Sequence, residues 1–430
     1  MTQVSPPVET PQSRAPSYWL VTLAAAAALM ITMGMRQSTG LFISPLNTAT
    51  GVGIATISLS IAVGHLVWGL IQPIAGAIAD RYGPGRVIAA GALVLATGYA
   101  VTPMMTSSVG LTLSIGFLMA AGAGMGSFSV LIGAAAQHLA AEKRGMASGI
   151  INAGASVGQM VFAPITQSLI TVAGWVNAMW ALALVSLLTL PMARLLRGKA
   201  KVVNAPAGSS AVPATDVSQG GNGGEAGDGG MRAAVAIAMR NRSFLLLNAG
   251  FFTCGFHIAF LVTHLPGEVA LCGLSPSVAS WSLAIIGLAN IIGSLAVGWG
   301  VGRYCSKMIL FWMYSSRVLL IAVYLAAPKT ELTLYLFAAG LGLTWLATVP
   351  PTAALVGKLF GMRYLSTLFG FTLLSHQIGG FLGAWLGGVA VVEWGSYNSI
   401  WVADMVLAAV AAAANLPIKE ARQSATPVPA

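Results

Sequence analysis

One charged side chain stands out by its place in the sequence. Arg36 lies within the apolar run that begins at Trp19, and that run contains no acidic residue to neutralise it. A guanidinium is costly within a membrane-spanning helix unless it is paired or faces water, so such an arginine is a candidate functional residue. Its planar fork suits bidentate binding of a carboxylate. The alternative is structural: the side chain reaches the outer interface or caps helix ends.

Histidine and amide side chains within other apolar runs form a second group of candidates. His257 and His264 are seven residues apart, and His65 is followed by Trp68 and Gln72, so each set shares one face of a helix. Histidine titrates near neutral pH and can relay protons or bind substrate, although each one alone could simply pack two helices together. Because packing needs fewer polar positions than these, the predicted substrate-binding residues are Arg36, Gln37, His65, Asn152, Gln159, Phe256, His257, Phe260, His264, Asn290, His376 and Gln377.

Two further charged residues fall within apolar runs of the second half of the chain. Arg317 and Asp404 both lie near the middle of their runs. A buried ion pair between them would compensate both charges, so a structural Arg317–Asp404 pair is the first hypothesis. The second is that Asp404 carries a coupling proton and Arg317 binds an anion.

The composition excludes a soluble enzyme. The chain has 430 residues, of which 57% are hydrophobic and 7% are charged, and its mean hydropathy is +0.82, whereas soluble domains carry roughly a quarter charged residues. It contains no H-E-x-x-H, G-x-S-x-G or P-loop motif. Its three cysteines have no metal-ligand spacing. The sequence therefore predicts a multi-pass membrane protein that is not an enzyme, with no resident cofactor or metal.

Apolar runs separated by charged or turn-rich breaks predict twelve membrane-spanning helices. The polar run AGSSAVPATDVSQGGNGGEAGDGG is too flexible to fold and predicts a linker between two six-helix halves. The predicted organisation is a tail over 1–18, a first half over 19–196, a linker over 197–242, a second half over 243–416 and a tail over 417–430; the helices lie near 19–43, 54–79, 87–106, 109–140, 146–170, 175–196, 243–267, 277–301, 308–327, 332–356, 364–392 and 396–416.

The distribution of basic residues predicts the orientation. If the N-terminus is cytoplasmic, 18 of the 21 basic residues lie on the cytoplasmic side, which is the positive-inside pattern. Both termini and the linker are then cytoplasmic. The net charge of +10 belongs to this pattern and indicates no nucleic-acid partner.

The two halves look like copies of one another. GAGMG (122–126) and GLGLT (340–344) are 218 residues apart, and GAIADRY (76–82) matches GWGVGRY (298–304) at an offset of 222. Gly302 stands where the first copy has Asp80, which predicts a weaker or differently paired second loop. Two six-helix repeats are typical of a transporter whose substrate site lies between them.

Several motifs resemble those of a known family. GAIADRYGPGR (76–86) resembles the signature loop of the major facilitator superfamily, in which Asp80, Arg81 and Arg86 would clamp neighbouring helix ends as gating residues. EKRGMASGIINAGASVGQ (142–159) is similar to the start of the fifth helix in its monocarboxylate-porter and oxalate/formate-exchanger branch, with Gly149, Ala153, Gly154 and Gly158 as the close-packed face. The segments 33–46 and 251–266 resemble bacterial members of that branch.

The resemblance implies the major facilitator fold in a bacterial inner membrane, as a monomer in the lipid bilayer. It also implies alternating-access transport of a small, monocarboxylate-like organic anion by symport or exchange. Asp404 is the one acid well inside a helix, so coupling would depend on histidine, on the protonation of the substrate, or on anion exchange. The alternative in the same fold is transport or efflux of a larger, mostly uncharged aromatic metabolite or drug. A sensor is disfavoured because the linker is short.

Overall fold

The computed structural model shows an all-helical chain. Among the residues that it describes there is no strand. The predicted tails and most of the predicted linker lie outside these residues. The described ranges are 18–138, 141–197, 228–301, 303–360 and 365–420.

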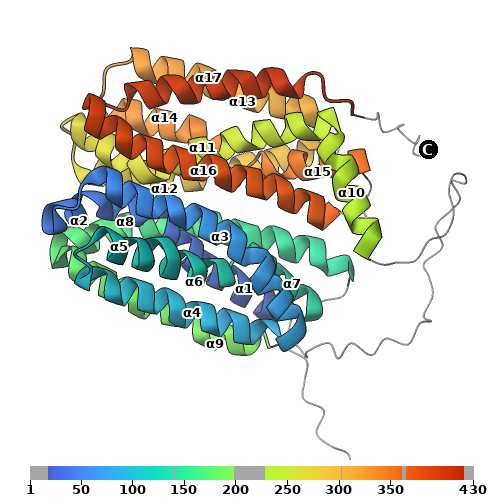
Figure 1. Ribbon diagram of the computed structural model, residues 1–430, viewed down its shortest axis with the longest axis horizontal. Coiled ribbons are helices and arrows are strands. Elements are labelled where there is room, and N and C mark those ends of the chain that lie inside the picture. The colour runs from blue at the N-terminus through green and yellow to red at the C-terminus, as the bar shows by residue number, and fades with distance from the viewer. Residues whose placement is uncertain (1–17, 139–140, 198–227, 302, 361–364, 421–430) are drawn as a thin grey trace, which may run out of the picture.

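The first half of the chain forms a bundle of helices (Figure 1). Several predicted spans consist of more than one element, because short 3-10 and π-helical segments connect the α-helices. The elements are α1 (Tyr18–Gln37), η1 (Thr39–Phe42), α2 (Ile43–Thr50), α3 (Ile54–Tyr82), α4 (Pro84–Val101), η2 (Thr102–Met104), α5 (Ser108–Leu111), η3 (Thr112–Met119), α6 (Ala120–Met125), α7 (Phe128–His138), α8 (Ala141–Leu187) and α9 (Thr189–Leu195).

The second half forms a matching bundle that lies over the first in Figure 1. Its helices are α10 (Asp228–Arg240), α11 (Arg242–Leu271), α12 (Pro276–Val301), α13 (Ser306–Ala326), α14 (Glu331–Thr344), α15 (Val349–Phe360), α16 (Leu365–Trp394) and α17 (Asn398–Asn415).

The helix lengths agree with the predicted passes. Ten helical segments of the described chain are long and apolar enough to cross a membrane. The 47 residues of α8 would span about 70 Å as one straight helix, but the backbone leaves helical geometry at Gly174 (φ 82°, ψ 158°), inside the predicted break. The ten segments count α8 once and do not include α16. When the two arms of α8 are counted separately and α16, with its 30 residues, is added, the total is twelve passes.

One part of the predicted linker is wrong. The linker was expected to lack structure up to residue 242, but residues 228–240 form α10. This helix packs against the start of α11. After its glycines the segment AAVAIAMR contains alanines and other good helix formers. Its high helix propensity explains why a helix forms there although a flexible glycine-rich run precedes it.

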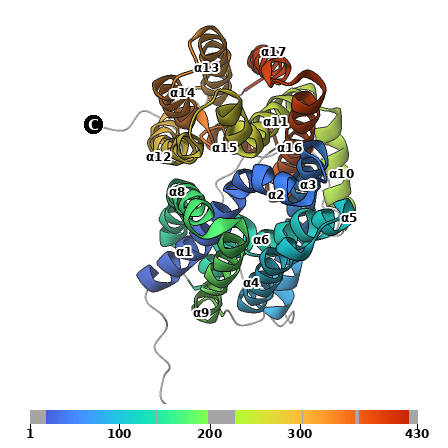
Figure 2. The same cartoon turned by 90° about the vertical axis from the view of Figure 1, so that its left-hand side faces the viewer.

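Two pairs of helices join the halves. α3 packs against α16, and α8 packs against α12. The end-on view in Figure 2 shows α3 beside α16 and α8 beside α12, with α2 between these two pairs. Within the halves, α1 packs on α8 as α11 packs on α16. The interface therefore repeats the same arrangement on both sides.

Matching glycines face the corresponding helix in each half. A methyl group at Gly122 would lie 2.4 Å from the backbone nitrogen of Leu95 in α4, and one at Gly340 would lie 2.7 Å from the end of the Leu320 side chain in α13. α4 and α13 are the third predicted helix of their halves. The helices approach more closely at Gly122, where the neighbour is backbone, than at Gly340, where it is a side chain.

One end of the bundle carries the described basic loops, and we call it the basic face. α3 turns into α4 there at Gly83, and α11 and α13 begin there at Arg242 and Ser306. The turn at Gly83 has a φ of 93°, which glycine adopts without steric cost. We call the other end of the bundle the opposite face.

The predicted close-packed face of α8 is correct at two of its glycines. Methyl groups at Gly154 and Gly158 would collide with the carbonyl oxygens of Ala26 and Met30 in α1, whereas one at Gly149 would meet no atom within 4 Å. Small residues allow this approach of two membrane helices.

The α1–α8 contact predicts opposite effects for two identical substitutions in one helix. Gly154→Ala should destabilise the protein by about 1–3 kcal/mol because α1 must shift to admit the methyl group. Gly149→Ala should be neutral or stabilising by up to about 1 kcal/mol because alanine favours the helix. Thermal unfolding of the purified variants measures both, and equal effects would contradict the contact.

Candidate functional site

A central cavity lies between the two halves. It has a volume of about 850 Å³ and is lined by residues of α1, α3, α7 and α8 on one side and of α11, α15 and α16 on the other. Its lining extends to Ala79 and Pro84 at the basic face. The cavity is therefore continuous from the middle of the bundle towards the basic face.

The halves meet beyond the cavity, towards the opposite face. A methyl group at Gly40 would lie 2.2 Å from the carbonyl oxygen of Val262 in α11, and one at Gly388 of α16 would lie 2.4 Å from the side chain of Ser58 in α3. These contacts join the two halves on the side of the cavity away from the basic face.

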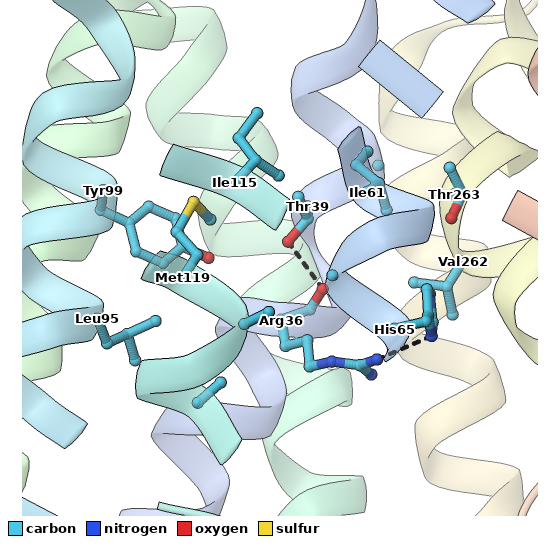
Figure 3. Close-up of a pocket in the computed structure, with 14 residues that line it drawn as sticks. Arg36, Thr39, Ile61, His65, Leu95, Tyr99, Ile115, Met119, Val262 and Thr263 are labelled. Carbon is cyan, nitrogen blue, oxygen red and sulfur yellow. Dashed lines mark hydrogen bonds between the residues drawn. The ribbon is translucent and has the colours of Figure 1, made fainter. Parts of the chain in front are cut away.

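Arg36 lines this cavity at the end away from the basic face, and Figure 3 shows its side chain pointing towards His65. Its Nη2 donates a hydrogen bond to Nδ1 of His65 at 2.9 Å, and its Cζ lies 4.6 Å from the centroid of the Trp68 ring. A guanidinium can only donate, so Nδ1 of His65 must be the acceptor. The imidazole is therefore neutral in this arrangement, with its proton on Nε2.

The guanidinium of Arg36 has no counter-ion among the described residues. The ion pairs in that part of the chain involve His257 with Asp404 and Lys358 with Glu420. A smaller cavity of about 40 Å³ lies behind Arg36, next to Tyr99 and Met119 (Figure 3). Its lining contains no acidic side chain either. The positive charge is thus stacked on an indole and hydrogen-bonded, but not neutralised.

Half of the predicted substrate-binding residues line the central cavity. They come from both halves, because α16 brings its polar residues against α3: a methyl group at Gly69 would lie 2.7 Å from the side chain of Gln377. Trp68 and Gln72 line it too, as their helical spacing from His65 indicates. The predicted residues that line the cavity are Arg36, Gln37, His65, Asn152, His376 and Gln377.

Several aromatic residues that line the cavity were not predicted from the sequence. Phe128, Phe251 and Phe369 belong to apolar stretches in which every position could equally face lipid or protein. In such helices the apolar residues are not confined to one face, so periodicity does not identify the cavity side.

The other six predicted residues do not line the cavity, and the prediction is corrected for them. Nε2 of His264 donates a hydrogen bond to the carbonyl oxygen of Ala384 at 2.7 Å, because a carbonyl oxygen can only accept. Phe260 packs edge-on against Trp401, with 4.8 Å between ring centroids. α11 therefore turns its histidine face into its own half. The six are Gln159, Phe256, His257, Phe260, His264 and Asn290.

The predicted Arg317–Asp404 pair is wrong. Asp404 instead pairs with Nδ1 of His257, and both side chains are buried, with exposures of 0% and 1%. Arg317 donates to the side chain and carbonyl of Thr344 and, at 2.9 Å, to the carbonyl of Trp345. The carbonyls at the end of α14 take the place of a carboxylate, which the sequence spacing did not reveal.

Arg317 caps a break in the tenth predicted helix. α14 ends at Thr344 and α15 begins at Val349, and the carbonyls freed between them need partners inside a membrane. Asn290 completes the cap: its Oδ1 accepts from the backbone N–H of Leu346 at 3.0 Å, and its Nδ2 donates to Oγ of Ser156 at 2.8 Å. Asn290 therefore ties the break to the other half.

The fourth predicted helix breaks at the equivalent point. α6 ends at Met125 and α7 begins at Phe128, and the carbonyl of Gly126 accepts from Oγ1 of Thr32 at 3.0 Å. Gly126 is 218 residues before Thr344, the repeat offset that the sequence indicates. Residues just after both breaks line the central cavity.

The predicted gating loop is described in part. The side chains of Asp80 and Arg81 lie outside the described part of the structure, and Arg86 is exposed at the start of α4. No interaction among these three is therefore assigned.

Glu420 supplies a carboxylate at the second loop, where Gly302 replaces the acid of the first copy. It accepts from the backbone N–H of Ser306 at 2.9 Å and of Lys307 at 3.0 Å, and from Nζ of Lys358 at 2.7 Å. Burial alone would raise the pKa of this carboxyl, but these hydrogen bonds and the Lys358 charge hold its pKa below its ordinary value.

These features define the class of protein: two helical halves around a central cavity are the arrangement of a membrane transporter. The profile of the Major Facilitator Superfamily matches residues 25–384, and the chain belongs to this superfamily. It is a multi-pass membrane transporter rather than an enzyme.

Two of the relatives with stated functions carry names of the predicted monocarboxylate and oxalate/formate branch, and a third is an efflux protein. The chain is 25% identical over 387 residues to monocarboxylate transporter 13 of Rattus norvegicus, covering 89% of this chain and 85% of the relative. It is 23% identical over 401 residues to the oxalate:formate antiporter of Oxalobacter formigenes, covering 91% and 89%. It is also 26% identical over 423 residues to the fujikurins efflux protein of Gibberella fujikuroi, covering 94% and 81%.

A solved structure shows the same fold. The crystal structure of a bacterial homologue to the human lysosomal transporter Spinster, in an inward-facing and occupied conformation, matches with a TM-score of 0.66. It covers 93% of this chain and 94% of that chain at 12% identity.

The corrected pairing predicts the outcome of a double-mutant cycle. Asp404→Asn and His257→Gln should each cost about 3 kcal/mol, because each leaves a buried partner unpaired, and the double variant should lose less than the sum by at least about 1 kcal/mol. Arg317→Gln and Asp404→Asn should be additive. Chemical unfolding in detergent measures both cycles. Coupling between Arg317 and Asp404, without coupling between His257 and Asp404, would contradict the corrected pairing and support the Arg317–Asp404 pair.

The Glu420 contacts predict a pH dependence. A carboxylate whose pKa is depressed by folding stabilises the protein above its unfolded pKa, and this contribution is lost as the pH falls through the folded pKa. The melting temperature of the wild type should exceed that of Glu420→Gln near pH 7, and the difference should shrink between about pH 5 and pH 3. A difference that is independent of pH would refute this role.

Proposed function

We propose that this transporter carries a small, monocarboxylate-like organic anion across the membrane and that Arg36 is its anchor. The supporting observation is the guanidinium that lines the central cavity without a described counter-ion. A charge in a low-dielectric site is costly unless a ligand or water compensates it. An anion that enters the cavity would supply that compensation.

The chemistry of the guanidinium favours a carboxylate. It presents several N–H donors in one plane and binds a carboxylate through two parallel hydrogen bonds. Only one of its nitrogens, Nη2, is used by His65, and Trp68 holds the plane from one side. Monocarboxylates and oxalate are also what the names of two relatives state.

The charge distribution supports an orientation. The basic face carries Arg86, Arg242, Lys307 and Lys358, and basic loops remain on the cytoplasmic side. In this proposal the protein lies in a bacterial inner membrane as a monomer, with cytoplasmic termini and halves at 19–196 and 243–416. The described cavity then opens to the cytoplasm, and rocking of the halves would expose Arg36 outside for symport or exchange.

A second candidate substrate is a larger, mostly uncharged aromatic metabolite or drug. The observation that favours it is the apolar wall that includes Phe128, Phe251 and Phe369. One relative, the fujikurins efflux protein, is named for the export of fujikurins and not for the transport of a monocarboxylate or oxalate. In that case Arg36 would be structural.

The proposal predicts that Arg36→Gln weakens anion binding. The loss of charged hydrogen bonds should cost about 1.5–3 kcal/mol, or a roughly 10- to 150-fold rise in the Kd of a bound carboxylate. Thermal stabilisation of the purified protein by a panel of carboxylates measures this. Arg303→Gln, which removes an exposed arginine stacked on Trp299, is the matched control. Unchanged affinity in Arg36→Gln would sink the proposal.

A further inference from the structure

We propose that the two halves divide the recognition of one substrate: the first half binds a single carboxylate through Arg36, and the second half binds an aromatic or bulky apolar group. The substrate class is then an amphipathic monoanionic acid. This inference rests on the proposed function and restricts it, because it excludes the simplest short-chain acids and dicarboxylates as preferred cargo.

The charge of the cavity limits the substrate to one carboxylate. Among the described residues that line it, Arg36 is the only one with a permanent charge. His65 cannot contribute a second positive charge while it accepts from Arg36. A second carboxylate could accept hydrogen bonds from amide or imidazole groups of the lining, but it would meet no second cation there, and burying a charge without compensation is strongly unfavourable.

Polar and apolar side chains are unequally divided between the halves. The first half contributes Arg36, Gln37, His65, Gln72 and Asn152 to the lining. The second half contributes His376 and Gln377, and its other described lining side chains are apolar. They include Phe251, Ile258, Leu346, Val349, Phe369 and Leu373.

Ring contacts form a continuous wall in the second half. The ring of Phe251 lies 5.0 Å from that of His376 and 6.2 Å from that of Phe369, measured between centroids. α16 begins at the basic face, so Phe369 lies nearer to that face than His376 does. The wall therefore runs along the cavity from its inner end towards its opening.

The inner end of this wall lies beside the anion site. A methyl group on Gly380, one helical turn after His376, would lie 3.1 Å from Nδ1 of His65, and that nitrogen is the partner of Arg36. A carboxylate on Arg36 would thus begin at the level of His376. An attached ring that extends towards the basic face would lie against His376 and Phe369.

A substrate with both parts would contact both halves at once. A ligand shifts a conformational equilibrium only by its differential affinity for the two states. A short acid on Arg36 would make few new contacts when the second half moves closer. A ring between the halves would bury more apolar surface when the halves close around it. The size of the substrate therefore determines how strongly it favours the closed state.

The test compares acetate with three ligands that carry a phenyl ring on a short carbon chain: 3-phenylpropanoate, phenylsuccinate and 3-phenylpropan-1-ol. Thermal stabilisation of the full-length protein in detergent gives each Kd. 3-Phenylpropanoate should bind at least tenfold more tightly than acetate, because its ring leaves water. It should also bind at least tenfold more tightly than the neutral alcohol and the dicarboxylate.

Variants of α16 identify the wall. Phe369→Ala should raise the Kd of 3-phenylpropanoate about tenfold and leave that of acetate unchanged. Phe371→Ala is the matched control, because this phenylalanine is 37% exposed and does not line the cavity. If Phe369→Ala does not fold, Phe369→Leu should lower the preference for aromatic over saturated cyclohexyl acids.

The outcomes separate the two proposals. Equal affinity for acetate and 3-phenylpropanoate, with both lost in Arg36→Gln, would overturn the division of recognition and leave Arg36 as anion anchor. Tighter binding of phenylsuccinate than of 3-phenylpropanoate would overturn the single-charge argument. Tight binding of the alcohol that survives Arg36→Gln would overturn the proposed function itself.

Discussion

The constraint on which the site depends is the placement of one guanidinium inside a membrane protein without a described counter-ion. Arg36 is held by a hydrogen bond to His65 and by stacking on Trp68, and neither contact neutralises its charge. Because desolvating an unpaired charge is costly, the cavity that reaches it must admit water or an anion. Its open connection to the basic face and its asymmetric lining both follow from this requirement.

The repeat sets the geometry around that charge. The fourth and tenth predicted helices both break beside the cavity, and each break needs partners for its free backbone groups. Thr32 supplies one in the first half, whereas Arg317 and Asn290 supply them in the second. Asn290 also bonds Ser156 of the other half. Arg317 and Asn290 therefore stabilise the wall of the cavity in the described conformation.

Sequence reasoning succeeded where a residue contradicts its surroundings. Arg36 is conspicuous in an apolar run, and it lines the central cavity. The segments at offset 218 look like copies, and their glycines Gly122 and Gly340 face the third helix of each half. It failed for His257 and Asp404, because an apolar helix gives no indication of which face meets the cavity and which meets a neighbouring helix. The His257–Asp404 pair joins residues 147 apart in the sequence, and only the packing of α11 against α17 brings them together. α10 was missed because the glycines before it suggested a flexible linker.

The most direct test of the central claim is a structure of the protein with a bound bromophenyl alkanoate, whose bromine marks the ring by anomalous scattering. The account predicts carboxylate density within hydrogen-bonding distance of the Arg36 guanidinium and a bromine position against α16 on the side towards the basic face. A carboxylate bound to other residues, with Arg36 still bonded only to His65, would contradict it.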